Sequence, residues 1–166
     1  MIASHMVERC LRVLAAIGLV GALFGAISAA AGEDAVRFER SEAVVLTQQG
    51  PVRFEVELAT TPKQREQGLQ HRQHLRAYEG MLFVFDDVAP VYMWMKNTLI
   101  PLDMIFLAAD GLIINIAERT TPLSLATVPS AGPAKGVLEV VGGTARRFAI
   151  RPGDRIVHPL LTGDGR

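Results

Sequence analysis

Residues 80–117 read GMLFVFDDVAPVYMWMKNTLIPLDMIFLAADGLIINIA, and this segment is the most informative about architecture. Short apolar runs in it alternate with turn residues, a pattern typical of β-strands joined by tight connections. The pair Asp110-Gly111 between two such runs is a strong β-hairpin signal. The segment therefore predicts strands, which are expected at 81–85, 91–97, 103–107 and 112–117.

More strands are expected on both sides of this segment. Residues 43–47 and 52–58 are β-rich runs around a turn, and residues 137–141 and 155–158 complete the set. Within 52–58, apolar and charged residues alternate with a period of two, which indicates a half-buried strand. Residues 119–136 carry three prolines among Ser, Thr and Gly, and this composition predicts a long loop.

Helical signals are few and short. Thr61 is a candidate N-cap, Pro62 suits the first helical position, and Gln64 completes a capping box. Gly68 is expected either to end this helix or to let it pack closely. A second short helix is expected within 143–150. Many short strands with one or two short helices favour a mostly β fold, either an antiparallel β-sandwich or an open barrel.

The N-terminus has the pattern of a secretory signal peptide. Arg9 and Arg12 precede an apolar run over residues 13–27, and small residues follow it. The run is short for a membrane span, so we expect cleavage after Ala30 or Ala31 and a periplasmic or secreted protein with no membrane attachment afterwards. Retention of the segment as an uncleaved anchor is the alternative.

Composition narrows the function classes. The 166 residues include 17 Lys+Arg and 17 Asp+Glu, and this balance offers no electrostatic case for nucleic acid as a partner. The single cysteine, Cys10, lies in the signal peptide at 1–31, so the mature chain would have no disulfide and no thiol nucleophile. The rest is expected to be a flexible lead-in at 32–42 and one β-rich domain at 43–166.

Candidate binding residues gather around residues 91–98. On a strand, Tyr92, Trp94 and Lys96 would share one face, so that an aromatic wall adjoins a cation. Such a face suits a small polar ligand such as a sugar or a peptide. The candidate ligand-binding residues are Trp94, Lys96, Asn97 and Asp103, with Arg65 and Arg72 as counter-charges. The alternative is a buried Lys96–Asp103 ion pair that only fixes the hairpin.

Other chemistries have weaker support. A hydrolase would use Asp103 or Glu118 as a base with Lys96 as an electrostatic stabiliser. A Cu(I) site would use Met93 and Met95, although core packing is the preferred explanation for these methionines. The histidines are scattered and are expected to be solvated surface groups: His71, His74 and His158. No nucleophile elbow or phosphate loop is present.

No catalytic residue, metal ligand or cofactor is therefore assigned from the sequence. The preferred interpretation is a non-catalytic, exported β-sandwich that binds a small polar ligand or a protein partner. The oligomeric state stays open.

Several blocks resemble the signature of family 192 of the domains of unknown function. They are Gly80–Phe85, Trp94–Thr98 and Pro101–Phe106, with Arg65-x-x-Gly68-Leu69 and Arg72 upstream and Gly136–Val140 and Gly153-Asp154 downstream. The similarity spans roughly residues 52–158 and departs from the family at Gln70 and at Val141-Gly142. The resemblance implies a compact, jelly-roll-like β domain, often exported in bacteria, with no established substrate or reaction.

Overall fold

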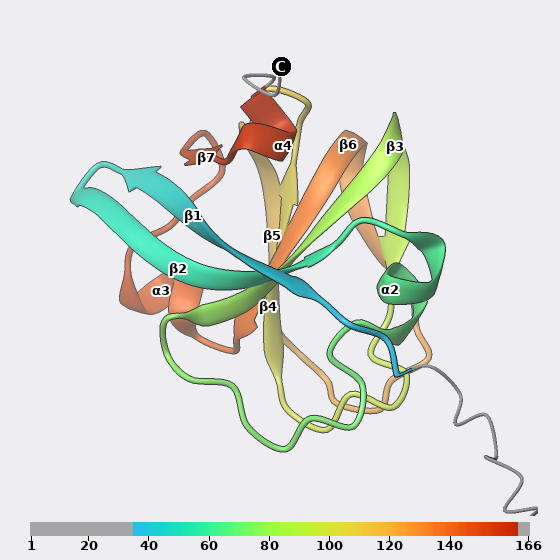
Figure 1. Cartoon of the computed structure of the whole chain (residues 1–166). Helices are drawn as coiled ribbons and strands as arrows, with labels where there is room; N and C mark the ends of the chain where they lie inside the picture. The colour runs from blue at the N-terminus through green and yellow to red at the C-terminus, as the bar shows by residue number, and fades with distance from the viewer. Residues whose placement is uncertain (1–34, 163–166) are drawn as a thin grey trace, which may run out of the picture. The chain divides into compact units, whose positions relative to one another are not determined.

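A curled, seven-stranded β-sheet dominates the computed structural model, which describes residues 35–162 (Figure 1). The strand order is β5-β4-β6-β3-β2-β1-β7. Every pairing in this order is antiparallel except that of β2 with β3. The expectation of a mostly β fold is confirmed, and a half-open barrel made from one sheet is the arrangement found.

The strands are β1 Glu39–Thr47, β2 Gly50–Ala59, β3 Glu79–Met93, β4 Leu102–Leu107, β5 Ile113–Thr120, β6 Val128–Val141 and β7 Arg155–Val157. The helices of the described residues are α2 Pro62–Gln67, α3 Thr144–Arg147 and α4 Pro159–Thr162. None of these helices is long and apolar enough to cross a membrane. The expected signal peptide at 1–31, its cleavage sites and Cys10 lie outside the described residues.

Both expected hairpins form. β1 and β2 pair from Thr47 opposite Gly50 outward, and β4 pairs with β5 around the Asp110-Gly111 turn. Gly111 has a φ of +81°, and a Cβ there would lie 2.1 Å from the carbonyl oxygen of Ile156, so only glycine fits. β1 begins at Glu39, inside the segment expected as a flexible lead-in, because residues 39–42 pair with β2.

Helix α2 starts as its sequence predicts. The Thr61 hydroxyl accepts from the backbone N–H of Gln64, and the Gln64 side chain accepts from the N–H of Thr61, which completes the capping box. Gly68 ends the helix with a φ of 48°. The β2-α2-β3 connection is a crossover between parallel strands, and it places α2 beside β3 (Figure 1).

Two expectations about strand length were wrong. The runs at 81–85 and 91–97 belong to one strand, β3, which ends at Met93 and leaves Trp94 and Lys96 on the following loop. β6 begins at Val128, so much of the expected loop at 119–136 is strand. Pro129 and Pro133 are tolerated in β6 because they flank the register shift between Pro90 and Tyr92, and such irregularities relieve the need for every N–H to pair.

Apolar side chains pack on both faces of the sheet. One buried cluster includes Phe54, Leu82, Ile105, Leu138 and Ile156. The other includes Leu69, Met81, Phe83, Met104 and Val137. Neighbouring residues of one strand, such as Leu138 and Val137, thus belong to opposite clusters, because side chains alternate between the two faces of a strand.

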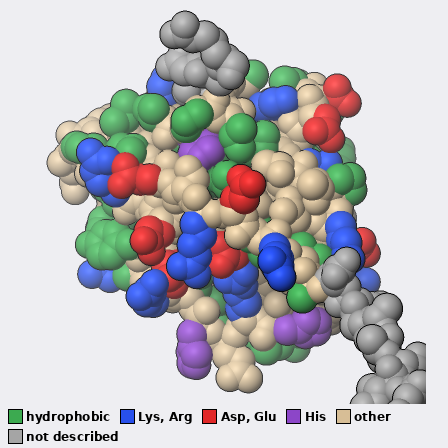
Figure 2. All heavy atoms as spheres, viewed as in Figure 1, with side chains coloured by type: hydrophobic (Ala, Val, Ile, Leu, Met, Phe, Trp, Pro, Cys, Tyr) green, Lys and Arg blue, Asp and Glu red, His purple; other side chains and the backbone are tan. Residues whose placement is uncertain are grey.

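On the face of the molecule that Figure 2 shows, basic and acidic side chains are interspersed rather than separated by sign.

Candidate functional site

A cleft lies over the second cluster, between the α2 region, β3 and β6. Its volume is about 360 Å³, at the lower end of the range for small-molecule sites. The α2 side contributes Arg65 through Gln70, β3 contributes Phe83, Phe85, Tyr92 and Met93, the following loop contributes Trp94, Lys96 and Thr98, and β6 contributes Glu139. The lining therefore combines aromatic walls with a few charged groups.

Glu139 is the buried charged group of this cleft. Its neighbours across the sheet are Met81 on β3 and Met104 on β4, both fully buried. The residue is 4% exposed, and its side chain forms no hydrogen bond or ion pair with any residue in the described range. Its carboxyl oxygens are not sealed off, since no fully buried side-chain oxygen lacks a partner among the described residues.

Burial controls the protonation of Glu139. The loss of contact with solvent raises the pKa of the Glu139 carboxyl to about 8, and no other cause contributes to this rise. No basic side chain is close enough to offset that effect. At neutral pH the group is therefore mainly a neutral carboxylic acid that faces the cleft.

Trp94 and Lys96 form the outer rim. The Lys96 ammonium lies 5.3 Å from the centre of the Trp94 ring, within the range of a cation–π contact. Trp94 is 46% exposed and Tyr92 is 67% exposed, so both rings are open to a ligand. Lys96 has no ion-pair partner among residues 35–162. Trp94 and Lys96 are both exposed, although they lie on the loop after β3 and not on the strand expected from the sequence.

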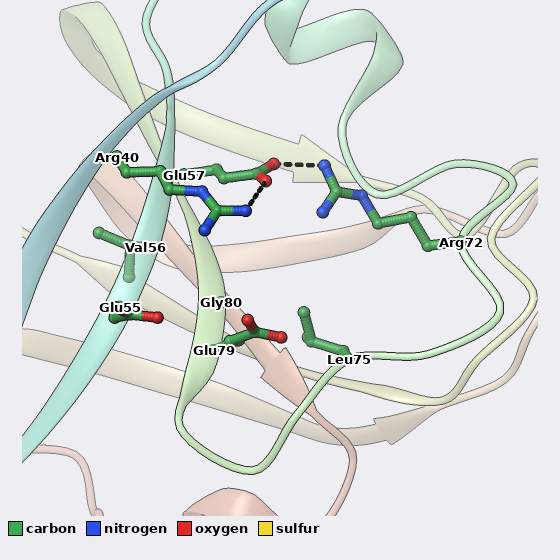
Figure 3. A pocket seen from close by; sticks show the side chains of 8 residues that line it. All are labelled: Arg40, Glu55, Val56, Glu57, Arg72, Leu75, Glu79 and Gly80. Atoms are coloured by element: carbon green, nitrogen blue, oxygen red, sulfur yellow. Dashed lines mark hydrogen bonds and ion pairs between the residues drawn. The ribbon is translucent and has the colours of Figure 1, made fainter.

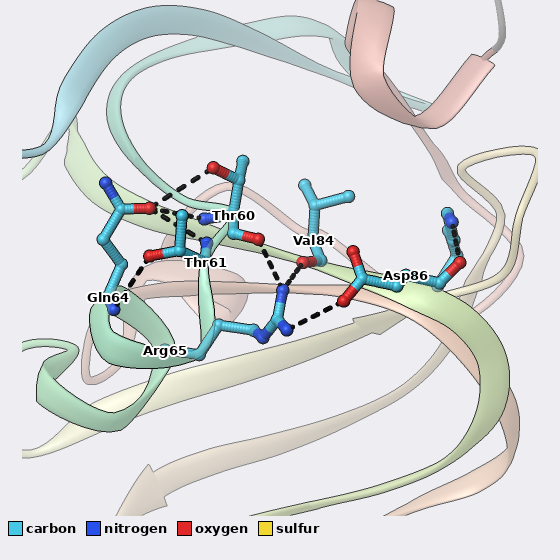
Figure 4. Close-up of polar contacts among 7 residues, drawn as sticks. Thr60, Thr61, Gln64, Arg65, Val84 and Asp86 are labelled. Atoms are coloured by element: carbon cyan, nitrogen blue, oxygen red, sulfur yellow. Dashed lines mark hydrogen bonds and ion pairs between the residues drawn. The ribbon is translucent and has the colours of Figure 1, made fainter.

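Arg65 is a structural part of the wall (Figure 4). One terminal nitrogen donates to the carbonyl oxygens of Thr60 and Val84 at 2.6 and 2.8 Å, and the other pairs with Asp86 at 3.0 Å. The guanidinium also lies over Phe85, 5.5 Å from the ring centre. These contacts fix α2 against β3, and the charge of Arg65 is already compensated by Asp86.

Arg72 and Asn97 are engaged elsewhere. Arg72 forms an ion pair with Glu57, which also faces Arg40, and this group lines a separate small pocket (Figure 3). Asn97 has a φ of 55°, and its amide donates to the side-chain oxygen of Gln70 at 3.0 Å. Asn97 therefore holds the turn after α2 in place at the edge of the cleft.

Asp103 does not lie in the cleft with Trp94 and Lys96, where the sequence analysis expected it. Its register partner on β6 is Val140, which belongs to the first cluster, so Asp103 lies on the face opposite Glu139. Its oxygens accept from the backbone N–H groups of Arg119, Gly143 and Ala145 at 2.8–3.0 Å. The expected meeting of Asp103 with Trp94 and Lys96 was wrong, and so was the alternative Lys96–Asp103 ion pair.

The residues named for other chemistries are also separated. Glu118 is exposed and does not line the cleft, while Asp103 is fully buried. Met95 is buried and its sulfur accepts from the Thr120 hydroxyl at 3.1 Å, whereas Met93 lines the cleft.

The histidines follow the sequence expectation in part. His71 and His74 are exposed, but His158 is buried and contacts the Ser41 hydroxyl at 3.0 Å, so its expected place on the surface was wrong. Residues 35–162 hold no cluster of three or more His, Cys, Asp or Glu side chains suited to a metal.

Sequence reasoning missed Glu139 as a site residue. The available signal was its place in the run Val137-Leu138-Glu139-Val140-Val141, where a lone acid interrupts an otherwise apolar strand. Charged side chains are rarely fully buried without a partner, so an acid in such a run marks a position that needs an explanation.

The family model of DUF192, described as an uncharacterized ACR, matches residues 44–158. The chain belongs to this family. A crystal structure from Sinorhizobium meliloti 1021, described as a proposed transcription regulator, is similar with 43% identity and a TM-score of 0.74, covering 76% of this chain and 99% of that one. A protein of unknown function from Novosphingobium aromaticivorans DSM 12444 is similar with 35% identity and a TM-score of 0.71, covering 75% and 94%. The comparison with curated proteins found no match.

Proposed function

We propose that this DUF192 domain is a non-catalytic binding protein for a small polar ligand, held in the cleft above Glu139. The observation that carries the proposal is the combination of a partly enclosed cleft, a buried carboxyl that has no partner among residues 35–162, and an exposed Trp94–Lys96 rim. Trp94 and Tyr92 would stack on the ligand, Lys96 would supply a positive charge, and Glu139 would be the buried polar contact.

Binding is favoured over the hydrolase interpretation because the named catalytic groups lie apart. Asp103 already accepts three backbone N–H groups, and Glu118 is not part of the cleft. Copper handling is also disfavoured, since the Met95 sulfur is occupied by Thr120 and only Met93 faces the cleft. On the face that Figure 2 shows, basic and acidic side chains are interspersed, so this face gives no support to a nucleic-acid partner.

The chain offers a built-in reporter for this proposal. Trp94 is its single tryptophan, so intrinsic fluorescence reports directly on the rim of the cleft. Purified protein would be titrated with a library of small sugars, carboxylates, amines and amino acids. We expect a saturable change in Trp94 emission with at least one class, weakened about tenfold or more by Lys96→Met, because a charged contact contributes about 1.5 kcal/mol or more.

Lys63→Met serves as the matched control, because Lys63 is exposed and does not line the cleft. Titration curves that are unchanged in Lys96→Met, or a library without any saturable ligand, would contradict the binding function.

Export is part of the proposal and rests on the N-terminal pattern. We expect the protein in the periplasmic fraction or the medium, with a mature N-terminus at Ala31 or Gly32. Cell fractionation with N-terminal sequencing tests this, and a cytoplasmic protein that retains residues 1–31 would refute it.

A further inference from the structure

Two neighbouring loops at one end of the half-open barrel form a continuous surface. They are the β3–β4 loop, residues 94–101, and the β5–β6 loop, residues 121–127. The Leu123 N–H donates to the Thr98 carbonyl oxygen, and the Met95 N–H donates to that of Ser124, both at 3.1 Å. These bonds hold the two loops side by side, at the lower edge of the molecule in Figure 1.

This loop surface exposes large apolar side chains. They are Trp94, Leu99, Leu123 and Leu125, which are 44–70% exposed, and they are four of the eleven large apolar side chains exposed among the described residues. A single exposed leucine needs no explanation, but a group of them on adjoining loops marks an interaction surface. Trp94 lines the cleft and the three leucines do not, so a small ligand in the cleft does not account for the leucines.

The charge within the two loops is of one sign. Neither loop contains an acidic residue, and the Lys96 ammonium has no ion-pair partner among residues 35–162. Of the acids that flank the loops along the chain, Asp103 is buried and bound to backbone N–H groups. Glu118 is exposed at the end of β5 and is followed by the exposed Arg119, so these two charges offset each other.

Helix α3 adds positive charge beside the loops. It begins next to the β3–β4 loop, because the Gly142 N–H donates to the Pro101 carbonyl oxygen at 2.8 Å. Arg146 and Arg147 of this helix are exposed, and neither has an acidic partner in the described part of the chain. The apolar loop surface is therefore flanked by unpaired cations.

We propose that this loop surface docks reversibly on a phospholipid bilayer that contains anionic lipids. The leucines enter the interfacial layer, Trp94 lies at the depth of the headgroups, and Lys96 faces the lipid phosphates. A second copy of the chain fits this surface less well. A two-fold contact would bring the same cations together, and like charges across an interface are unfavourable.

Membrane docking goes beyond the small-ligand function proposed above and does not depend on it. It differs from the sequence-based expectation of no membrane attachment, since the overall charge balance does not show where charges gather in the fold. The contact is peripheral and is formed by loops, so it is compatible with an exported protein that is released from membranes at high salt. Docking would also place the rim of the cleft at Trp94 beside the bilayer.

The experiment measures co-flotation of the purified protein with lipid vesicles. Vesicles of phosphatidylglycerol and phosphatidylethanolamine are compared with vesicles of phosphatidylcholine alone. We expect binding to the anionic vesicles that weakens with added salt, because the cations then contribute less. Trp94 is the single tryptophan, so its emission should shift to shorter wavelength on binding and should be quenched by lipids with brominated acyl chains.

Variants separate the apolar and the electrostatic contributions. Leu123→Ser/Leu125→Ser should weaken vesicle binding about tenfold or more, since two exposed leucines no longer enter the interface. Leu46→Ser is the matched control, because Leu46 is 44% exposed on β1, at the upper side of the molecule in Figure 1, and should change nothing. Lys96→Met should weaken binding to anionic vesicles about fivefold.

All variants share the same N-terminus, so any contribution of residues 1–34 to vesicle binding is common to them. Circular dichroism checks that each variant is folded. Leu123→Ser/Leu125→Ser should also leave the small-ligand titrations unchanged, since neither leucine lines the cleft.

The inference is overturned if the protein does not float with anionic vesicles, if brominated lipids do not quench Trp94, or if Leu123→Ser/Leu125→Ser binds as tightly as Leu46→Ser. Analytical ultracentrifugation without lipid tests the alternative occupant. A dimer that is lost in Leu123→Ser/Leu125→Ser would make the surface an interface between copies and would also overturn membrane docking. If vesicles bind as expected while no compound of the ligand library does, docking stands and the small-ligand function fails.

Discussion

Replacing Asp103 by Asn should destabilise the fold while leaving the cleft intact. The fully buried carboxylate accepts from three backbone N–H groups, of Arg119, Gly143 and Ala145. In the variant, the amide oxygen can still serve Arg119 and Gly143, but the NH₂ group then faces the N–H of Ala145. The Ala145 N–H and the new side-chain NH₂ are then two buried donors without an acceptor, and at about 1–3 kcal/mol each they cost about 2–6 kcal/mol.

Urea denaturation followed by circular dichroism measures this cost. Asp87→Asn is the matched control, because Asp87 is exposed on β3 and should change the free energy of unfolding by less than about 0.5 kcal/mol. Ligand affinity should be unchanged in folded Asp103→Asn, since Asp103 lies on the face opposite Glu139. A loss of stability below about 1 kcal/mol would refute the reasoning that the Asp103 carboxylate stabilises the fold by accepting these backbone N–H groups.

Three further outcomes are expected. The free energy of unfolding should fall as the pH rises from about 4.5 to about 8, because the folded state retains the proton on Glu139 that the unfolded chain releases. The fall should be on the order of 5 kcal/mol. Denaturant titrations at several pH values measure it, and Glu139→Gln should remove this pH dependence. Gly68→Ala should lower the free energy of unfolding by about 1–3 kcal/mol, because φ is 48° and the new Cβ would lie 3.1 Å from Phe83; a Tm equal to that of the unchanged protein would contradict this. Thr61→Ala should cost about 1 kcal/mol through loss of the capping box, and Gln67→Ala, at an exposed position in the last turn of the same helix, is the comparison in the same thermal assay.

Local features of the fold were predictable because their causes lie within a few residues. The capping box at Thr61 and Gln64 depends on atoms three residues apart, and the Asp110-Gly111 hairpin depends on one turn. The alternation in 52–58 similarly identified the buried face of β2, where Phe54, Val56 and Leu58 are buried. In each case the sequence neighbours are also the physical partners.

Features that depend on distant partners were not predictable. β6 continues through Pro129 and Pro133 because irregular pairing with β3 makes room for them, which no feature of residues 119–136 indicates. Asp103 and Lys96 are seven residues apart, yet strand alternation and the end of β3 at Met93 direct them to different places. Trp94 and Lys96 were placed together correctly, because their cation–π contact spans two residues.

The position of Glu139 argues for a function of the cleft rather than of the core. Keeping a carboxyl between Met81 and Met104 costs free energy at any pH above about 4.5, where the same group would ionise in the unfolded chain. That cost, on the order of 5 kcal/mol, is a large part of the roughly 5–15 kcal/mol by which a typical domain is stable. Leu or Met at the same position would avoid it. Asp103 shows how this fold treats an acid needed for structure, since it surrounds that carboxylate with backbone N–H groups. Among the described residues, no backbone N–H group donates to Glu139, which faces a cleft where its carboxyl oxygens are not sealed off, so the contrast with Asp103 supports the binding role proposed for this carboxyl.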